Sequence, residues 1–130
     1  MGNRAVITTR KNLENNGVGI YVHWCGSPES ITAFLNVCKD RGYRSPDKDN
    51  YGWAYLAGVI TNYFGDGLSC GVDILSNLDC DNYDNGVYII EDWEIVGREY
   101  THDIDDPPLN YDQVRDMEFD IISRQPQDWR

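Results

Sequence analysis

The order of apolar and polar residues over the first 24 positions is typical of two strands joined by a polar segment. Residues 4–9 alternate around Val6 and end in two threonines, and residues 18–24 are rich in Val, Ile, Tyr and Trp. Such β-branched and aromatic side chains favour the half-buried surface of a sheet. Because residues 11–17 between these runs are mostly polar, the pattern predicts a turn there and an antiparallel strand pair.

A helix is predicted over residues 28–41. Ser27 is a suitable N-cap, Pro28 fits the first helical position, and Glu29 places an acid in the first turn. The apolar residues that follow recur at helical spacing until Gly42, which is a typical stop signal. They are Ile31, Phe34, Leu35 and Cys38.

A second helix is predicted after the polar connection 44–50, where Asp49 or Asn50 can serve as its cap. The sequence Gly-Asp-Gly at residues 65–67 should end it. The predicted core face of this helix is made of Trp53, Ala57, Ile60 and Phe64.

The C-terminal half predicts a hairpin and one more helix. Residues 68–78 are ambiguous, with a short strand expected over 70–75, and an Asn-Gly turn signal precedes the β-rich runs 87–90 and 93–96. An Asp-Asp-Pro-Pro break then leads to Asn110, which with Gln113 can cap a last helix. That helix should direct four residues toward the core: Tyr111, Val114, Met117 and Ile121.

Strands and helices in separate blocks, without strict alternation, indicate an α+β fold with a mostly antiparallel sheet, two central helices and a C-terminal helix. The length of 130 residues fits one domain, which we place at residues 1–124, with a loose tail at 125–130. The break before the last helix could let that helix dock on another copy, so a homo-oligomer is among the expectations.

Charge divides the chain near its middle. Residues 1–65 carry seven Lys/Arg against five Asp/Glu, whereas residues 66–130 carry four against seventeen, within a total charge of −11. An acidic half of this kind suits a positively charged partner and repels nucleic acid and anionic membranes. No apolar run approaches the roughly 18 residues that span a bilayer, and the first residues lack a signal-peptide core, so we expect a cytoplasmic protein.

Metal and cofactor sites are not indicated by the sequence. The four cysteines contain no CxxC pair, and no phosphate-binding, dinucleotide-binding or HExxH motif occurs. The Asp-rich segment 79–85 could coordinate a hard cation, but Tyr83 stands at the third position of the calcium-loop alignment, so an Asx-rich turn is favoured. His23 and Cys25 would share one face of a strand, which leaves open whether they are reactive or structural.

Two sets of residues are candidate binding sites. On the last helix three aspartates spaced by four form a ladder of like charge, which costs stability and therefore suggests a surface for a basic partner. In the near-neutral half, arginines mingle with aromatic residues, as in sites that neutralise a phosphate and stack a base. The acidic candidates are Asp112, Asp116 and Asp120, with Asp103, Asp105 and Asp106. The nucleotide candidates are Arg4, Arg10, Trp24, Arg44, Tyr51 and Trp53.

Four blocks of the sequence, GNRAVITT at residues 2–9, GIYVHW at 19–24, YGWA at 51–54 and DNGVYIIEDWEIVGR at 84–98, resemble a family of small acidic proteins of bacteriophages and mobile elements. The resemblance spans about residues 2–100 and implies no particular cofactor or catalytic residue. Accessory phage proteins of this size are often inhibitors of host defence, in the manner of anti-CRISPR proteins. The resemblance thus implies a binding role in the cytoplasm of a bacterial host.

The leading hypothesis from the sequence is a stoichiometric anti-defence inhibitor. In it the acidic surface imitates a nucleic acid and occupies the basic site of a host defence protein, with no direct contact to nucleic acid or membrane. One alternative is a sponge that sequesters a small nucleotide signal in the N-terminal half. A second alternative is a hydrolase that destroys such a signal, although no catalytic residues or cofactor are evident from the sequence.

Overall fold

The computed structural model describes residues 2–102 and 104–127. Its first elements are strand β1 (Ala5–Thr8), helix α1 (Arg10–Asn15) and strand β2 (Val18–Val22). The two strands pair antiparallel as predicted, with Val6 opposite Tyr21. The predicted polar turn is wrong, because α1 occupies most of it. The Thr9 side chain accepts a hydrogen bond from the Asn12 backbone N–H, and this N-cap starts a helix that the apolar pattern does not reveal.

The two central helices are α2 (Pro28–Asp40) and α3 (Tyr51–Phe64). The cap predicted for α2 is confirmed, since the Ser27 hydroxyl accepts from the Ser30 N–H. At the start of α3 the Asp49 carboxylate accepts from the Tyr51 N–H. Its buried face is rotated from the predicted one, because Trp53, Ala57 and Phe64 are only partly buried. The buried positions are Gly52, Leu56, Val59, Ile60 and Tyr63.

The remaining elements are β3 (Cys70–Ile74), β4 (Val87–Glu91), β5 (Glu94–Glu99) and α4 (Tyr111–Ser123), with short 3-10 turns η1 (Gly65–Gly67) and η2 (Leu75–Asn77). The predicted short strand, hairpin and last helix are confirmed. The hairpin turn is formed by Asp92 and Trp93, both with positive φ, which suits the right-handed twist of a tight hairpin.

The sheet has the strand order β3-β2-β1-β4-β5. Three of the four neighbouring pairs are antiparallel, and only β1 and β4 run parallel, with Val6 opposite Val87. The α+β class with a mostly antiparallel sheet is therefore confirmed. The parallel pair brings the carboxyl ends of β1 and β4 to the same end of the sheet.

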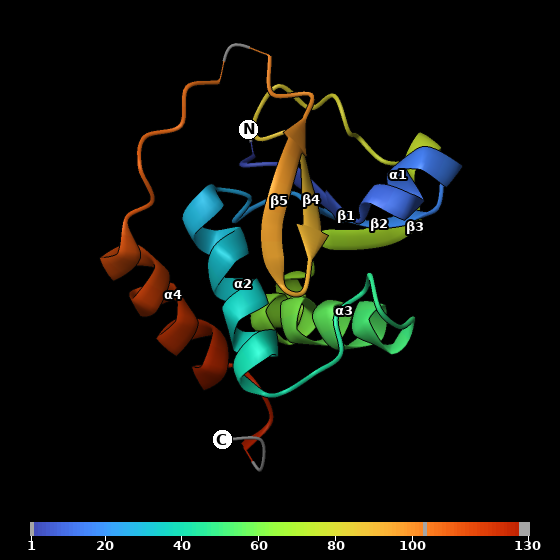
Figure 1. Ribbon diagram of the computed structural model, residues 1–130. Helices are drawn as coiled ribbons and strands as arrows, with labels where there is room; N and C mark the ends of the chain where they lie inside the picture. Colours follow the sequence, from blue (N-terminus) through green and yellow to red (C-terminus); the bar gives the residue numbers. More distant parts are fainter. Residues whose placement is uncertain (1, 103, 128–130) are drawn as a thin grey trace.

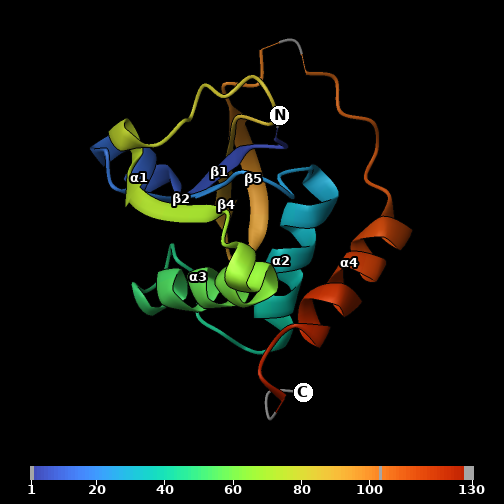
Figure 2. The same cartoon turned by 180° about the vertical axis from the view of Figure 1, so that it is seen from behind.

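The main core lies between one face of the sheet and helices α2 and α3, and α4 packs on the outer side of α2 (Figures 1 and 2). Strand residues such as Ile7, Ile20 and Tyr88 alternate into this core, as the two-residue period of a strand requires. On the opposite face a smaller cluster around Val6 packs against Leu13 of α1 and Leu75 of η2.

Two expectations for the C-terminal segment are wrong. Tyr111 does not face the core, being 75% exposed, because the helix turns Val114 and Ile121 inward instead. The tail is not loose at its first residue, since Gln125 is buried and its amide donates to the Val59 and Ile121 carbonyls and accepts from Asn62. Residues 128–130 lie outside the described part. Within that part no helix has both the length and the apolar character to cross a membrane.

Candidate functional site

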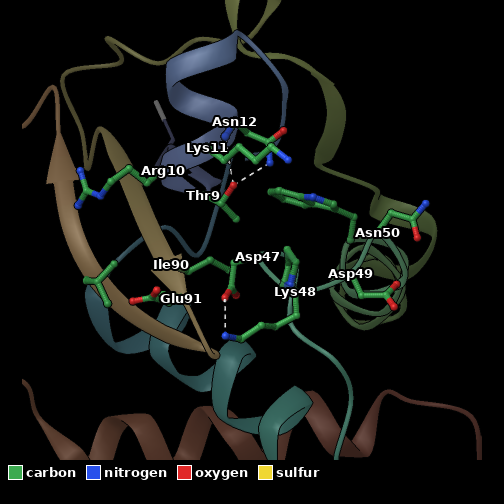
Figure 3. A pocket seen from close by; sticks show the side chains of 13 residues that line it. Thr9, Arg10, Lys11, Asn12, Asp47, Lys48, Asp49, Asn50, Ile90 and Glu91 are labelled. Carbon is green, nitrogen blue, oxygen red and sulfur yellow. Dashed lines mark hydrogen bonds and ion pairs between the residues drawn. The ribbon is translucent and has the colours of Figure 1, made fainter.

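A cleft of about 510 Å³ lies at the carboxyl ends of β1 and β4 (Figure 3). Its walls are residues 9–12 at the start of α1, residues 46–50 ahead of α3, and the ends of β4 and β5. Trp53, Ile90, Glu91 and Val96 complete the lining. A cleft of this size, lined by polar side chains together with a few apolar ones, lies within the size range of small-molecule sites.

The upper wall is fixed by Thr9. Its buried hydroxyl accepts hydrogen bonds from both the backbone N–H and the side-chain amide of Asn12, at 3.3 and 2.7 Å. These bonds turn the chain sharply from β1 into α1, so that Arg10 and Lys11 follow at the rim of the cleft (Figure 3).

The lower wall is held by a set of bonds around Asp47. One carboxylate oxygen of Asp47 accepts from the Ser45 hydroxyl at 2.5 Å and from the Asp92 N–H at 3.0 Å, which ties the wall to the β4–β5 turn. On its other side the wall lies directly against α3. A Cβ at Gly52 would come within 2.3 Å of the Ser45 carbonyl carbon, so only glycine permits this approach.

The charges around the cleft are not all compensated. Lys48 Nζ lies 3.9 Å from the Asp47 carboxylate and 3.5 Å from that of Asp92. In contrast, Arg10 and Lys11 are exposed and form no ion pair within residues 2–102 and 104–127. Arg10 and Lys11 on one wall are therefore available to an anion, within a lining that carries Asp47, Asp49 and Glu91 as well as Arg10, Lys11 and Lys48.

Apolar and aromatic groups line the same cleft as these cations. Trp53 is partly buried and lines the cleft, as do Ile90 and the half-exposed Val96. An indole can stack on a flat ring, while carboxylate and amide groups such as those of Glu91 and Asn12 can hydrogen-bond the edge of that ring. The cleft therefore provides the contacts that a small anion with an aromatic ring requires.

The structure brings only some of the six nucleotide candidates together. Arg10 and Trp53 both line the cleft. Arg44 and Tyr51 lie at its border, where the guanidinium is 4.8 Å from the Tyr51 ring and 3.2 Å from the carboxylate of Asp49, a lining residue. Arg10 is the first residue of α1, Arg44 lies in the segment that leads into α3, and Tyr51 and Trp53 lie in the first turn of α3.

Arg4 and Trp24 lie at the other end of the sheet. Arg4 precedes β1 and Trp24 follows β2, and these ends coincide because the two strands are antiparallel. Arg4 is already paired, with its guanidinium 2.8 Å from Asp84 and 3.2 Å from Asp79. This partner holds the pKa of Asp84 below its ordinary value. A single pocket containing all six candidates is therefore not formed.

His23 and Cys25 do not form a pair. β2 ends at Val22, and Cys25 takes a left-handed backbone conformation with φ of 61°, which breaks the alternation expected for a strand. His23 Nδ1 lies 2.8 Å from the Tyr21 hydroxyl, whereas Cys25 Sγ lies 4.0 Å from the hydroxyl of Tyr63. Burial raises the pKa of Cys25, so this thiol is suited to packing rather than to nucleophilic attack.

The acidic segment 79–86 is built as an Asx turn. The buried Asn82 side-chain oxygen accepts from three successive backbone N–H groups, those of residues 84–86. The three carboxylates do not share one centre. Asp79 and Asp84 both contact Arg4, whereas Asp81 contacts His102. Within the described chain, no three His, Cys, Asp or Glu side chains are grouped to hold a metal ion.

The aspartate ladder on α4 is partly neutralised by its own helix. Asp112 lies 2.9 Å from Arg115, and Asp120 pairs with Arg124 and also accepts a hydrogen bond from the Tyr63 hydroxyl. Asp116 is exposed and has no ion-pair partner among the described residues. Of the other acidic candidates, Asp105 is exposed, Asp106 pairs with Arg98 at 2.5 Å, and Asp103 lies outside the described residues.

Several residues of the cleft were not among the candidates from the sequence, notably Lys11, Asn12, Asp47, Lys48 and Glu91. The cap signal at Thr9, followed by Arg-Lys-Asn, is the local pattern from which Lys11 and Asn12 could have been predicted. The others come from distant segments, whose meeting depends on the parallel pairing of β1 and β4. No protein-family model, curated protein or solved structure matches this chain, so the resemblance to small acidic phage proteins stays an expectation from the sequence.

Proposed function

We propose that this protein binds a small anionic ligand with an aromatic ring, such as a nucleotide, in the cleft at the ends of β1 and β4. The observation that carries the proposal is that Arg10 and Lys11, which form no ion pair among the described residues, line the same cavity as Trp53. This corresponds to the nucleotide sponge expected from the sequence as an alternative. It is now preferred to an acidic mimic, because Asp112 pairs with Arg115 of the same helix and Asp120 pairs with Arg124 directly after it.

The loss of affinity expected in variants of the cleft can be worked out from typical interaction energies. A hydrogen bond to a charged group contributes about 1.5–3 kcal/mol, and stacking of a base on an aromatic side chain contributes about 1–3 kcal/mol. Loss of both cations should therefore weaken binding by roughly 100-fold or more, since each 1.4 kcal/mol is a factor of ten. Replacement of Trp53 by Leu should weaken it by roughly 10-fold, because an apolar contact remains.

The test is isothermal titration calorimetry with a panel of mononucleotides, dinucleotides and cyclic dinucleotides. The Arg10→Ala/Lys11→Ala variant should lose binding of whichever nucleotide the parent retains. Arg115→Ala is the matched control, because it removes an exposed arginine from α4, which does not line the cleft. If the parent binds no member of the panel, or if the double variant binds as tightly as the parent, this function is wrong.

Sequestration and hydrolysis are distinguished by the fate of the ligand. A binding protein releases the nucleotide unchanged after denaturation, in an amount equal to the protein present, whereas a hydrolase yields product over many turnovers. The proposal predicts the unchanged nucleotide; if product appears instead, the cleft carboxylates of Asp47 and Glu91 are the general-base candidates. Chromatography of the denatured complex decides between the two.

A second candidate function is binding of a basic host protein by the outer face of α4, as in the inhibitor hypothesis from the sequence. The favouring observation is that Tyr111 and Phe119, which are 75% and 67% exposed, lie beside Asp112 and Asp116 on this helix. Exposed aromatic groups among acids are suited to a protein interface with a basic rim. Both candidate functions would act in the cytoplasm of a bacterial host, against its defence.

Phage plating on host strains that each carry one defence system would separate the two modes. Expression of the parent protein should restore phage plating on a strain whose defence system it inhibits. If the cleft is responsible, Arg10→Ala/Lys11→Ala should abolish the effect and Asp112→Lys/Asp116→Lys should not. The opposite pattern would favour the acidic face. Asp120 is left unchanged, because its bonds to Tyr63 and Arg124 contribute to packing.

A further inference from the structure

Strand β3 forms an open edge of the sheet, since among the described residues β2 is its only neighbouring strand. Opposite residues are hydrogen-bonded at both ends of this pair of strands, where the His23 N–H donates to the Ser69 carbonyl at 2.8 Å and the Leu75 N–H donates to the Gly17 carbonyl at 2.9 Å. Because bonded and non-bonded pairs alternate in an antiparallel ladder, the N–H and C=O groups of residues 70, 72 and 74 point away from β2. They face the outside of the sheet, and β3 lies nearest the viewer in Figure 2.

Only part of this edge is capped. The outward N–H of Ile74 is taken by the carboxylate of Asp73, at 2.7 Å. The outward N–H groups of Cys70 and Val72 have no hydrogen-bond partner in the described chain. Two residues of the edge are thus available to pair with another strand.

The side chains along this edge are apolar and exposed. Leu68, Val72 and Ile74 are 58%, 55% and 41% exposed, and with Cys70 they share the face of the sheet that bears α3. Residues 68–74 carry one charge, on Asp73. The opposite edge, β5, is different, because Glu94, Arg98 and Glu99 place charges along it in the manner that prevents pairing with other chains.

We propose that two copies of this chain associate through their β3 strands, antiparallel about a two-fold axis between the two Gly71 residues. In this register Cys70 lies opposite residue 72 of the second copy, so the two outward-facing backbone groups bond each other in both directions. Leu68 lies opposite residue 74 of the second copy, and the apolar side chains form one continuous row across the interface. Gly71 leaves the centre free, because no atom lies within 4 Å of a Cβ placed there.

The charge of the strand is compatible with self-pairing. In the proposed register Asp73 lies opposite residue 69 of the second copy, which is a serine, so no like charges face each other. The molecules as a whole repel, since each carries −11. Association should therefore strengthen as salt screens this repulsion, over a Debye length of about 10 Å at 0.1 M.

Sedimentation velocity across a range of protein concentration and at two salt concentrations tests the proposal. The parent should shift from the 14.9 kDa monomer toward twice that mass as concentration rises, and the shift should need less protein at high salt. Val72→Pro should remain monomeric, because proline removes an outward N–H without removing a bond to β2. Val72→Thr is the matched control, since it keeps the N–H and the branched shape and should still associate.

Amide hydrogen exchange in the parent tests the proposal without relying on the fold of the proline variant. The N–H of Val72 should exchange rapidly in dilute protein and become protected as concentration rises, while that of Gly71, bonded to β2, stays protected throughout. A parent that is monomeric at every concentration, a Val72→Pro variant that still dimerises, or a Val72 amide that exchanges rapidly at all concentrations would overturn it. The proposal would also be overturned if the protein is a monomer whose β3 edge pairs only with an extended segment of a different protein.

Discussion

Two glycines of the same helix should respond in opposite ways to replacement by alanine. In α3, a Cβ at Gly52 would lie 2.3 to 2.6 Å from backbone atoms of Ser45 and Pro46, whereas a Cβ at Gly58 would meet no atom within 4 Å. Ordinary contact begins at about 3.4 Å, so Gly52→Ala must push the wall of the cleft away by about 1 Å. Such overpacking costs about 1–3 kcal/mol. Gly58→Ala should instead stabilise the protein by about 0.5–1 kcal/mol, the helix preference for alanine over glycine.

Urea unfolding followed by far-UV circular dichroism measures both effects. With a slope of about 1–3 kcal/mol per molar urea, the two variants should differ in midpoint by at least about 0.5 M, with the parent between them. Gly52→Ala should also weaken nucleotide binding, because the displaced wall carries Asp47 and Lys48. If Gly52→Ala is as stable as Gly58→Ala, segment 45–50 does not approach α3 as closely as described. The position of this wall of the cleft is then wrong as well.

Three other predictions concern the regions around the site. The lowered pKa of Asp84, below its ordinary value of 3.8, means that its pairing with Arg4 stabilises the fold above about pH 4 and is lost as the pH falls through the lowered pKa. The stability difference between the parent and Asp84→Asn in urea titrations should therefore shrink below pH 4, and a constant difference would contradict this. Gln125→Ala should lower the free energy of unfolding by about 1–3 kcal/mol, because it leaves buried partners unsatisfied, whereas the exposed Gln127→Ala should have no effect in the same unfolding experiment. Burial raises the pKa of Cys38 to about 12, so mass spectrometry should find this thiol unmodified by iodoacetamide in the native protein at pH 8 and modified in urea; rapid native modification would mean that it is not buried.

Elements with a strong local signal could be predicted from the sequence. Helix α2 is one example, because its cap at Ser27, its proline at the next position and its apolar spacing all agree. Helix α1 could not be predicted from apolar periodicity, since Leu13 is its only large apolar residue and the cap at Thr9 initiates it. The predicted buried face of α3 was wrong, because the small apolar residues of this helix lie on more than one of its faces.

The cleft depends on contacts that local patterns do not encode. Its walls come from three separate parts of the chain, and they meet because Val6 pairs with Val87 across 81 residues. Arginines and aromatic residues could be recognised as candidates from their chemistry, but not sorted between the two ends of the sheet. Arg10 and Arg4 illustrate this, since β1 separates them and only Arg4 has acidic partners within reach.

Nucleotide binding in the cleft is tested most directly by titrating isotopically labelled protein with a nucleotide and following the amide chemical shifts in heteronuclear NMR spectra. We predict that the largest shifts occur in the amides of residues 9–12, of residues 47–53 and of Glu91, with saturation at one nucleotide per chain. Amides of α4 and of β3 should change little. An absence of shifts throughout the nucleotide panel, or shifts centred on α4, would contradict the assignment of the cleft as the binding site.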